Sequence, residues 1–474
     1  MVDSTLALLT QGYAWLPDLS RRKGPGPVRT RLLGKPAVAL RGPAAVKFFY
    51  DEQHVRRRTA LPEPILSTLF GHGAVHTLDG REHRARKALF VSLLQDAAGV
   101  AALAERVGEE WDRAAEEWSD RSEVTLFDEV GVLITRAVCA WAGVPLGAGP
   151  EGASRFGGPE GAEGSDAEVR RTARDLVAMV DGFATAGPRH WRARHSRRRQ
   201  EKRLARLVEE IRREVRSADG ASSGTGHPFT GSGTGHPLTD SGTGRPATDS
   251  GAGRPLSDSG AGGPVTAVEA VAAHREADGE LLDPHTAAVE ILNIIRPTVA
   301  VTWYTVFGAH ALHRHPALRE PLALDRPGYA RAFAHELRRF YPFAPFVAGH
   351  APADVEWHGE PIEAGTLVLL DLYGQNHDPG LWHEPYRFDP ERFTGREPGR
   401  DELVPQGGGE AAEGHRCPGE DITLAVLSTL LPRLARLGHR VPEQDLRIPL
   451  DRMPTGPRSG FRITDVSTPR RSED

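Results

Sequence analysis

Residues 403–434 read LVPQGGGEAAEGHRCPGEDITLAVLSTLLPRL, a glycine-rich loop that ends at Cys417 and Pro418 and leads into an apolar run with helical spacing. Proline is favoured in the first turn of a helix, so the pattern predicts a helix that begins just after Cys417. Backbone N–H groups and the helix dipole favour a thiolate there, and neighbouring His415 and Arg416 add positive charge. We therefore expect the sulfur of Cys417 to bind a metal.

The chain has only two cysteines, which restricts the kind of metal centre. Zinc and iron–sulfur clusters would require further cysteine ligands close by, whereas a haem iron needs a single proximal thiolate. A lone thiolate after a glycine-rich loop therefore favours haem b. The second cysteine, Cys139 in ITRAVCAWAGV, has apolar neighbours, and we expect it to be an inert core residue.

The bulk composition is that of a globular protein without a strong electrostatic field. The 474 residues are 39% hydrophobic, and 59 Lys and Arg stand against 64 Asp and Glu for a net charge of −5. This balance predicts no nucleic-acid partner. No basic leader precedes an apolar stretch at the N-terminus, and no uncharged apolar run approaches the ~20 residues needed to cross a bilayer. We expect a cytoplasmic protein without stable membrane insertion.

The spacing of apolar residues predicts a mainly α protein with a minor β-sheet. Helical periodicity recurs over 100–118, 169–187 and 197–215. Strand-like segments bounded by glycine or proline lie at 29–42 and 366–374.

An Arg-rich run from Arg192 to Arg203 begins just before the last of these helical stretches and continues into it. Such a run predicts a solvated helix face, with contact to acidic lipid or a partner as the alternative.

One segment has a different composition from the rest. From Ser223 the units SGTGHPFTG, SGTGHPLTD, SGTGRPATD and SGAGRPLSD follow one another with a nine-residue period. Gly, Ser, Thr and Pro dominate, so almost nothing in this segment can be buried to offset the entropy lost on ordering. We expect a single domain over 1–474 that is interrupted by a disordered Gly/Ser/Thr/Pro-rich insert over 217–280.

Two further motifs precede the cysteine loop in a fixed order. In HELRRFYPF, Glu336 and Arg339 lie at i and i+3 and can pair on one helix face, and RFDPERF supplies Arg392. The ordered set resembles the cytochrome P-450 superfamily over essentially the whole ordered chain. The resemblance implies the cytochrome P-450 fold, Cys417 as the axial ligand of haem, and a structural ionic cluster of Glu336, Arg339 and Arg392.

The chain also departs from the usual superfamily pattern. Its cysteine loop is enlarged, and Arg416 directly precedes Cys417. The helix expected over the distal face of the haem reads AAVEILNIIRPTVAVTWYTVFGAHALHRHP, with Arg296 and Pro297 in a region where ordinary members carry an acid and an alcohol beside a glycine. This replacement resembles the fatty-acid peroxygenase family, and FYDEQHVRRRTALP, LFGHGAVHTLDGREHRARKALF and PQGGGEAAEGHRCPGE agree with it.

The resemblance implies that Arg296 binds the carboxylate of a fatty acid near the iron, and that this carboxylate handles the protons. Physical chemistry agrees, because an arginine keeps its charge, its planar fork matches a carboxylate, and a charge in an apolar helix face requires an anionic partner. Pro297 removes one backbone N–H and opens the helix locally. The alternative for Arg296 is a buried ion pair with an Asp or Glu of the protein.

Three phenylalanines are candidate walls of an apolar channel for the acyl chain, with ordinary core packing as the alternative for each. They are Phe70, Phe343 and Phe346.

His76, in GAVHTLDG, matches a position where many hydroxylases of the family carry Gln and olefin-forming decarboxylases carry His. An imidazole exchanges protons around neutral pH, so His76 is predicted to assist decarboxylation as well as hydroxylation. Packing or a plain hydrogen bond is the alternative. The resemblance further implies that Arg57, His83 and Lys87 contact the two haem propionates, where cations face carboxylates.

The combined expectation is a haem-thiolate enzyme that uses hydrogen peroxide to hydroxylate fatty acids at the α or β carbon, with some decarboxylation to terminal alkenes and without a redox partner. Two alternatives stay open. One is a redox-partner-dependent cytochrome P-450 monooxygenase that acts on another small molecule. The other is a non-catalytic haem-binding protein.

Overall fold

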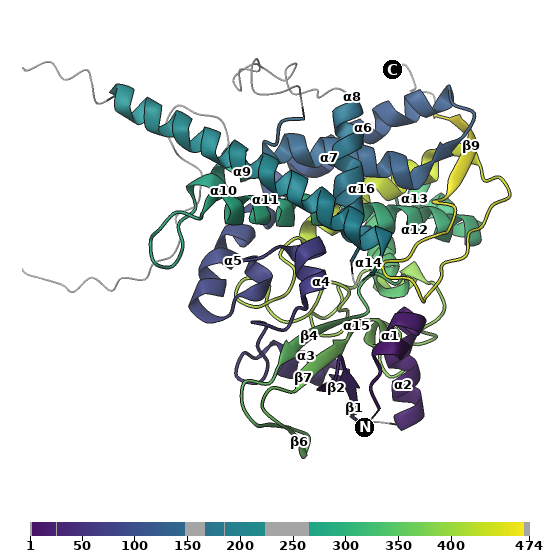
Figure 1. Ribbon diagram of the computed structural model, residues 1–474. Coiled ribbons are helices and arrows are strands. Elements are labelled where there is room, and N and C mark those ends of the chain that lie inside the picture. The colour runs from purple at the N-terminus through teal and green to yellow at the C-terminus, as the bar shows by residue number, and fades with distance from the viewer. Residues whose placement is uncertain (1, 25, 147–165, 184, 223–264, 469–474) are drawn as a thin grey trace, which may run out of the picture.

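The computed structural model describes residues 2–24, 26–146, 166–183, 185–222 and 265–468. A large helical body carries a small sheet at the end of the molecule where the N-terminus lies (Figure 1). The predicted fold class, mainly α with a minor β-sheet, is confirmed.

The helical periodicity of the sequence marks the long helices correctly. The predicted stretches 100–118, 169–187 and 197–215 correspond to α6, α8 and α9. The α-helices of the described residues are α1 (Thr5–Gln11), α2 (Trp15–Lys23), α3 (Pro43–Tyr50), α4 (Glu63–Ile65), α5 (Gly80–Leu94), α6 (Ala97–Ser119), α7 (Leu126–Ala142), α8 (Asp166–Asp181), α9 (Pro188–Ser222), α10 (Ala267–Ala273), α11 (Pro284–Val299), α12 (Val301–Arg314), α13 (Arg319–Ala323), α14 (Tyr329–Phe340), α15 (Leu372–Asn376) and α16 (Glu420–Arg436).

The main sheet joins the start of the chain to its last third. Its order is β1-β2-β7-β4, with β1 antiparallel to β2, β2 parallel to β7, and β7 antiparallel to β4. Leu33 and Gly34, both with positive φ, form the tight turn between β1 and β2. The strands are β1 (Val28–Leu32), β2 (Lys35–Leu40), β3 (Val124–Thr125), β4 (Phe346–His350), β5 (Val355–Trp357), β6 (Glu360–Ile362), β7 (Leu367–Asp371), β8 (Gly438–Arg440) and β9 (Arg462–Ser467).

One extensive apolar core runs through α6, α7, α11, α12, α14 and α16. Close approach of α12 to α16 depends on Gly308, because a Cβ there would lie 2.7 Å from Leu431 Cδ2. Helices α11 and α12 follow each other with only Ala300 between them, three residues after Pro297. Pro297 therefore lies next to a short break between two consecutive helices, and the chain stays helical beyond it.

The Arg-rich run lies within α9, as predicted, but only part of it faces solvent. Arg192, Arg198 and Lys202 are exposed, whereas Arg197 is 1% exposed. The expectation of a uniformly solvated face is therefore wrong for Arg197. Its Nη1 and Nη2 donate to the carbonyls of Leu69 and Phe70, and its Nε donates to Glu201, so its buried polar atoms have partners.

The expected insert over 217–280 has ordered residues at both ends. Helix α9 continues to Ser222, and α10 lies within 265–280 with Thr266 as its N-cap and a capping box to Glu269. The remaining repeat residues, 223–264, lie outside the described residues. The disorder of the insert stays a prediction.

Within the described part of the chain, no single helix is long and apolar enough to span a membrane. The bent pair α5 and α6, which meet at 55°, passes the same length and composition criteria only when taken together.

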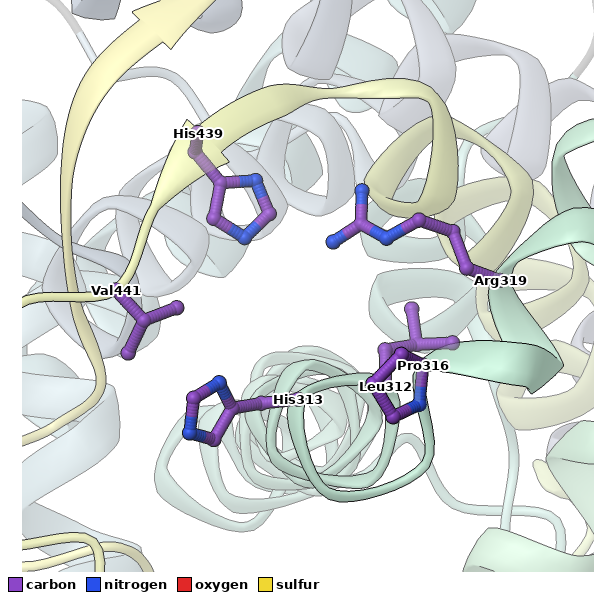
Figure 2. A pocket seen from close by; sticks show the side chains of 6 residues that line it. All are labelled: Leu312, His313, Pro316, Arg319, His439 and Val441. Carbon is purple, nitrogen blue, oxygen red and sulfur yellow. The ribbon is translucent and has the colours of Figure 1, made fainter.

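A surface cleft of about 250 Å³ lies where the end of α12 meets β8 (Figure 2). His313, Arg319 and His439 point into it, and Arg319 Nη1 also donates to the carbonyls of Ala435 and Leu437 at the end of α16. Arg319 therefore caps the last carbonyls of α16. This cleft contains none of the predicted site residues.

Candidate active site

Cys417 lies at the end of the loop that precedes α16, as the sequence predicts. Its backbone N–H donates to the carbonyl of Gln406 over 3.2 Å, and the side-chain amide of Gln406 lies 3.7 Å from Sγ. The backbone N–H of Gly419 also donates to the sulfur. A cleft of about 300 Å³ reaches Cys417 from the side of Arg416 and Glu420.

The expectation that His415 and Arg416 stabilise the thiolate of Cys417 is wrong. Burial raises the pKa of the Cys417 thiol, and the opposing influences are the Gly419 N–H and the Lys87 ammonium. His415 and Arg416 do not act on the sulfur as expected, because they face Asp79 and Glu420 at 3.5 and 2.6 Å. A buried thiol of this kind loses its proton when it coordinates a metal ion.

Basic side chains from separate segments converge beside the cysteine loop. Arg57 donates from Nη1 to the carbonyl of Ala348, and Lys87 donates to the carbonyl of Arg416 over 2.5 Å. The rings of His83 and His415 stack with their centroids 3.9 Å apart. The structure thus brings Arg57, His83 and Lys87 to the same region and adds His415; their contact with haem propionates stays a prediction.

One carboxylate, that of Asp79, faces this basic cluster, 3.5 Å from Nε2 of His415. Burial, followed by the charges of His415 and Lys87, lowers the pKa of His83 to about 3. Burial also lowers the pKa of Lys87 to about 8. His83 Nδ1 is buried without a hydrogen-bond partner among the described residues. Such a cluster fits a buried group that carries two carboxylates, as haem does.

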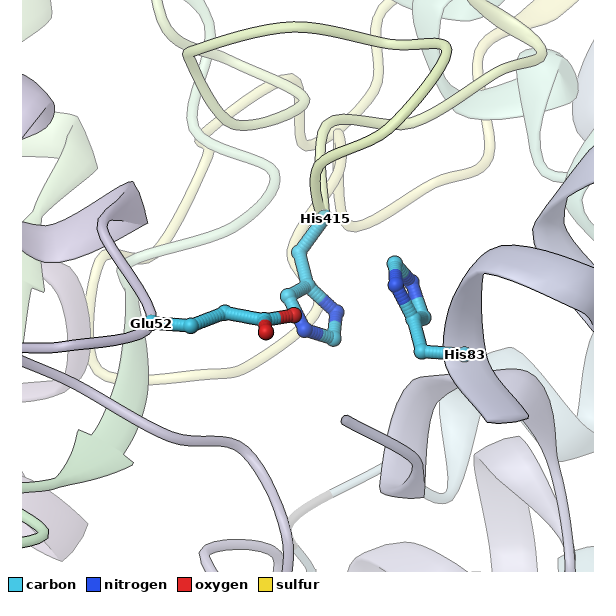
Figure 3. Close-up of side chains that lie close together, drawn as sticks. All are labelled: Glu52, His83 and His415. Carbon is cyan, nitrogen blue, oxygen red and sulfur yellow. The ribbon is translucent and has the colours of Figure 1, made fainter. Parts of the chain in front are cut away.

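Glu52 points toward the ring of His415 from one side, and His83 lies on the other side of that ring (Figure 3). Its carboxylate, His83 and His415 each place one ligand atom within 4.8 Å of the others, a spacing that could hold a metal ion. The positive charges of Arg57 and Lys87 oppose a further positive charge on His83, and Glu52 already accepts from the backbone N–H of Gly80. The cluster therefore favours an anion over a cation.

Arg296 is buried in α11, with 5% of its surface exposed. Nη2 donates to Oδ1 of Asn293 over 3.2 Å, and Nε has no partner. Across the described ranges, no carboxylate lies within 4.0 Å of the guanidinium, so the alternative of an internal ion pair finds no support. Burial, followed by repulsion from Arg197, lowers the pKa of Arg296 to about 9. The guanidinium is therefore a buried cation without a carboxylate partner in the part of the chain that the structure describes.

His76 and Phe70 lie beside this arginine. Phe70 ends the π-helical turn η2 (Leu66–Phe70), and its ring lies 5.8 Å from the Arg296 guanidinium carbon and 4.4 Å from the His76 ring. His76 belongs to the 3-10 turn η3 (Val75–Thr77), and its Nδ1 has no partner. Burial, followed by repulsion from Arg296 and Lys87, holds the pKa of His76 well below its usual value. These surroundings thus favour the neutral form of His76.

The other two predicted channel residues have different surroundings. Phe343 packs against Tyr304, with ring centroids 5.2 Å apart, at the edge of the main core. Phe346 packs against Trp15 in a separate apolar cluster below the sheet. These contacts favour the core alternative for Phe346.

The ionic cluster predicted from the two upstream motifs is confirmed. Arg339 Nε and Nη2 each donate to Glu336 over 2.7 Å, and both side chains are completely buried. Arg392 Nε lies 3.6 Å from the same carboxylate. Cys139 is also buried completely, and burial raises its pKa to about 12, as expected of an inert thiol.

Sequence reasoning missed the polar residues behind Arg296. Glu290 and Asn293 precede it at intervals of three residues, and all three side chains are buried on α11. This spacing places them along one helix face. Polar residues at three-residue intervals within an apolar helical stretch were the sequence pattern that could have revealed them.

Comparison with known proteins agrees with this geometry. The cytochrome P-450 family model matches residues 323–442. Among curated proteins, cytochrome P-450 4e5 of Drosophila mettleri is 32% identical over 28% of this chain, and cyclooctat-9-en-7-ol 5-monooxygenase of Streptomyces melanosporofaciens is 31% identical over 33%. These matches span only 24% and 37% of the relatives' own lengths.

Solved structures match over nearly the full chain. Cytochrome P-450SP alpha in complex with (R)-ibuprofen is 38% identical, with a TM-score of 0.80 and coverage of 98% of this chain and 99% of that one. A variant of cytochrome P-450 OleT in complex with arachidonic acid is 31% identical, with a TM-score of 0.81 and coverage of 99% and 98%. Cytochrome P-450EX alpha with myristic acid is 31% identical, with a TM-score of 0.80 and coverage of 98% and 97%.

The chain belongs to the cytochrome P-450 superfamily of haem-thiolate oxidoreductases, within its fatty-acid peroxygenase family.

Proposed function

We propose that this protein uses hydrogen peroxide to hydroxylate fatty acids at the α or β carbon and decarboxylates part of them to terminal alkenes. The observation that carries the proposal is the buried guanidinium of Arg296, which has no carboxylate partner in the described chain. The ligands named with the three solved relatives, ibuprofen, arachidonic acid and myristic acid, are all carboxylic acids. A fatty-acid head group would supply the missing negative charge.

One set of residues would hold the haem, and a second set would line the substrate site beside it. Cys417 would hold the iron through its sulfur, and Arg57, His83 and Lys87 would hold the propionates. The bound haem supplies the oxidising chemistry when it reacts with peroxide. Phe70 would form a wall beside the head group and the first carbons of the substrate.

Arg296 has two roles in this proposal. Its Nε has no acceptor among the described residues, so a substrate carboxylate can accept a hydrogen bond from it. Arginine stays protonated and cannot act as a base. In this proposal the bound substrate carboxylate therefore takes the proton from peroxide and returns it. Pro297 leaves the carbonyl of Asn293 without its helical donor and loosens α11 next to the guanidinium.

The test is turnover of purified protein with hydrogen peroxide and saturated fatty acids of graded length, with products separated by gas chromatography. We expect hydroxy acids and alkenes from the wild type and a loss of at least ~100-fold for Arg296→Ala, because both the binding of the head group and the placement of its proton depend on one side chain. Arg198→Ala, which removes an exposed arginine of α9, is the matched control and should retain wild-type turnover.

Two results would contradict the proposal. Turnover with a ferredoxin and its reductase but none with peroxide would favour a conventional monooxygenase. A normal haem spectrum without any oxidation product would favour a haem-binding protein.

A further inference from the structure

Glu290 is a completely buried carboxylate on α11, one and a half turns before Arg296. Three donors surround it: the backbone N–H of Val75 at 2.8 Å, Nη1 of Arg86 at 2.6 Å and Nδ2 of Asn293 at 3.1 Å. Val75 precedes His76 in the chain. One carboxylate thus connects α11 with the turn that carries His76 and with Arg86 of α5.

Asn293 continues this network to the guanidinium. Its Nδ2 donates to Glu290 and also to the carbonyl of Phe70 over 3.0 Å, while its Oδ1 accepts from Nη2 of Arg296. The Phe70 carbonyl accepts a second hydrogen bond from Arg197 over 2.8 Å. The polar groups behind His76, Phe70 and Arg296 therefore belong to one hydrogen-bonded unit.

The direction of the Asn293 amide follows from its neighbours. An asparagine side chain has one donating and one accepting end, and two acceptors, the Glu290 carboxylate and the Phe70 carbonyl, face the donating end. The accepting end must then face Arg296. A reversed amide would place Nδ2 against a guanidinium N–H and Oδ1 against a carboxylate and a carbonyl, all of which are repulsive.

We propose that Glu290 is a positioning residue for the fatty-acid site: it fixes the Asn293 amide and, through it, the direction of the Arg296 guanidinium. This inference rests on the proposed function, because it treats Arg296 as the site of the fatty-acid head group. Glu290 does not touch the substrate. Its effect on binding passes through Asn293. Its hydrogen bond from the Val75 N–H ties the turn of His76 to α11.

The alternative role is purely structural, since the Glu290–Arg86 ion pair also joins α5 to α11. Arg86 has a second carboxylate partner, Glu276, which does not contact Asn293. Glu276→Gln is therefore a matched control. It removes one carboxylate charge beside Arg86, as Glu290→Gln does, but leaves the hydrogen bonds from Glu290 through Asn293 to Arg296 intact.

The decisive variant is Glu290→Gln, which is nearly identical in shape but places an NH₂ group against one of its donors. If the new amide keeps its oxygen toward Val75 and Arg86, its nitrogen meets Asn293 Nδ2, and the relay loses its orientation. We expect the dissociation constant of a long-chain fatty acid, measured by calorimetry on the haem-loaded enzyme, to rise about tenfold. The KM for that acid should rise in parallel, with kcat changed by less than about threefold. Glu276→Gln should bind within about twofold of the wild type.

A double-mutant cycle separates the relay from general destabilisation. Asn293→Ala removes the intermediate group, so adding Glu290→Gln to it should weaken binding no further. If the two effects multiply instead, Glu290 acts independently of Asn293 and the inference is overturned. It is also overturned if Glu290→Gln, or Asn293→Ala should the first variant fail to fold, binds the fatty acid as tightly as the wild type.

The outcomes for the two proposals differ. A wild-type protein that binds no fatty acid would overturn the proposed function and this inference together. A wild-type protein that binds and oxidises the acid, beside a Glu290→Gln variant with unchanged affinity, would overturn only the inference.

Discussion

The buried pair of Glu336 and Arg339 allows a quantitative test of which charges hold the fold. In Arg339→Ala, the carboxylate of Glu336 stays completely buried and loses both of its 2.7 Å hydrogen bonds. Breaking a buried ion pair from one side costs about 3–5 kcal/mol. The guanidinium also donates to the carbonyls of Asn376, Pro385 and Arg387, each of which adds about 1 kcal/mol when its donor is removed. The expected loss is at least about 5 kcal/mol, a large part of the free energy of unfolding of an ordinary domain.

Arg392→Ala is the matched comparison within the same cluster. Its Nε lies 3.6 Å from Glu336, beyond hydrogen-bond distance, and its Nη2 donates to the carbonyls of Glu384 and Arg387. We expect a loss of about 1–2 kcal/mol, mainly from these two hydrogen bonds. The difference between the two variants should therefore reach about 3 kcal/mol.

The assay is urea unfolding of the purified variants, followed by circular dichroism, with haem content read from absorbance. Equal losses for Arg339→Ala and Arg392→Ala, within about 1 kcal/mol, would refute the assignment of energies from burial and hydrogen bonding. So would a selective loss of fatty-acid binding in a variant that keeps its full stability, because the cluster would then serve the site rather than the fold.

Two further predictions concern histidines. His76→Gln should lower the ratio of alkene to hydroxy acid severalfold, measured by gas chromatography, because it removes the neutral imidazole beside Arg296 and Phe70; an unchanged ratio would assign His76 to packing. Burial lowers the pKa of His377 to about 4, so below pH 6.5 only the unfolded chain takes up this proton and stability falls as the pH drops. Between pH 7 and pH 5 His377→Gln should abolish about 2 kcal/mol of that loss in urea titrations; a pH dependence equal to that of the wild type would contradict the assignment.

The parts of the molecule that the sequence predicted best are encoded locally. Cys417 follows a glycine-rich loop and precedes a helix, and Glu336 and Arg339 are three residues apart on one helix, so neighbouring positions already contain the geometry. Arg296 was identifiable because a charge within an apolar helical stretch is rare without a function. Its placement beside Phe70 and His76 followed from the family resemblance rather than from any local pattern.

The predictions that failed depended on which way side chains point. Arg416 and His415 were expected to act on the cysteine sulfur, but carboxylates distant in the chain or one helical turn away lie closer to them. Arg197 was expected in solvent, and nothing in a basic run shows that one arginine turns inward to backbone carbonyls more than 120 residues earlier. The partners of Glu290 at Val75 and Arg86 are likewise more than 200 residues away.

The contrast between the two cysteines gives a direct way to count loaded molecules. Cys139 is sealed in the core with a pKa raised by burial to about 12, whereas Cys417 borders a cleft that opens to the outside. Of the two sulfurs, an alkylating reagent can reach that of Cys417 from the cleft, slowly because burial raises the pKa of the thiol, and iron ligation would occupy that same atom. The mass increase of the intact protein after alkylation then reports the share of chains without cofactor, independently of any colour measurement.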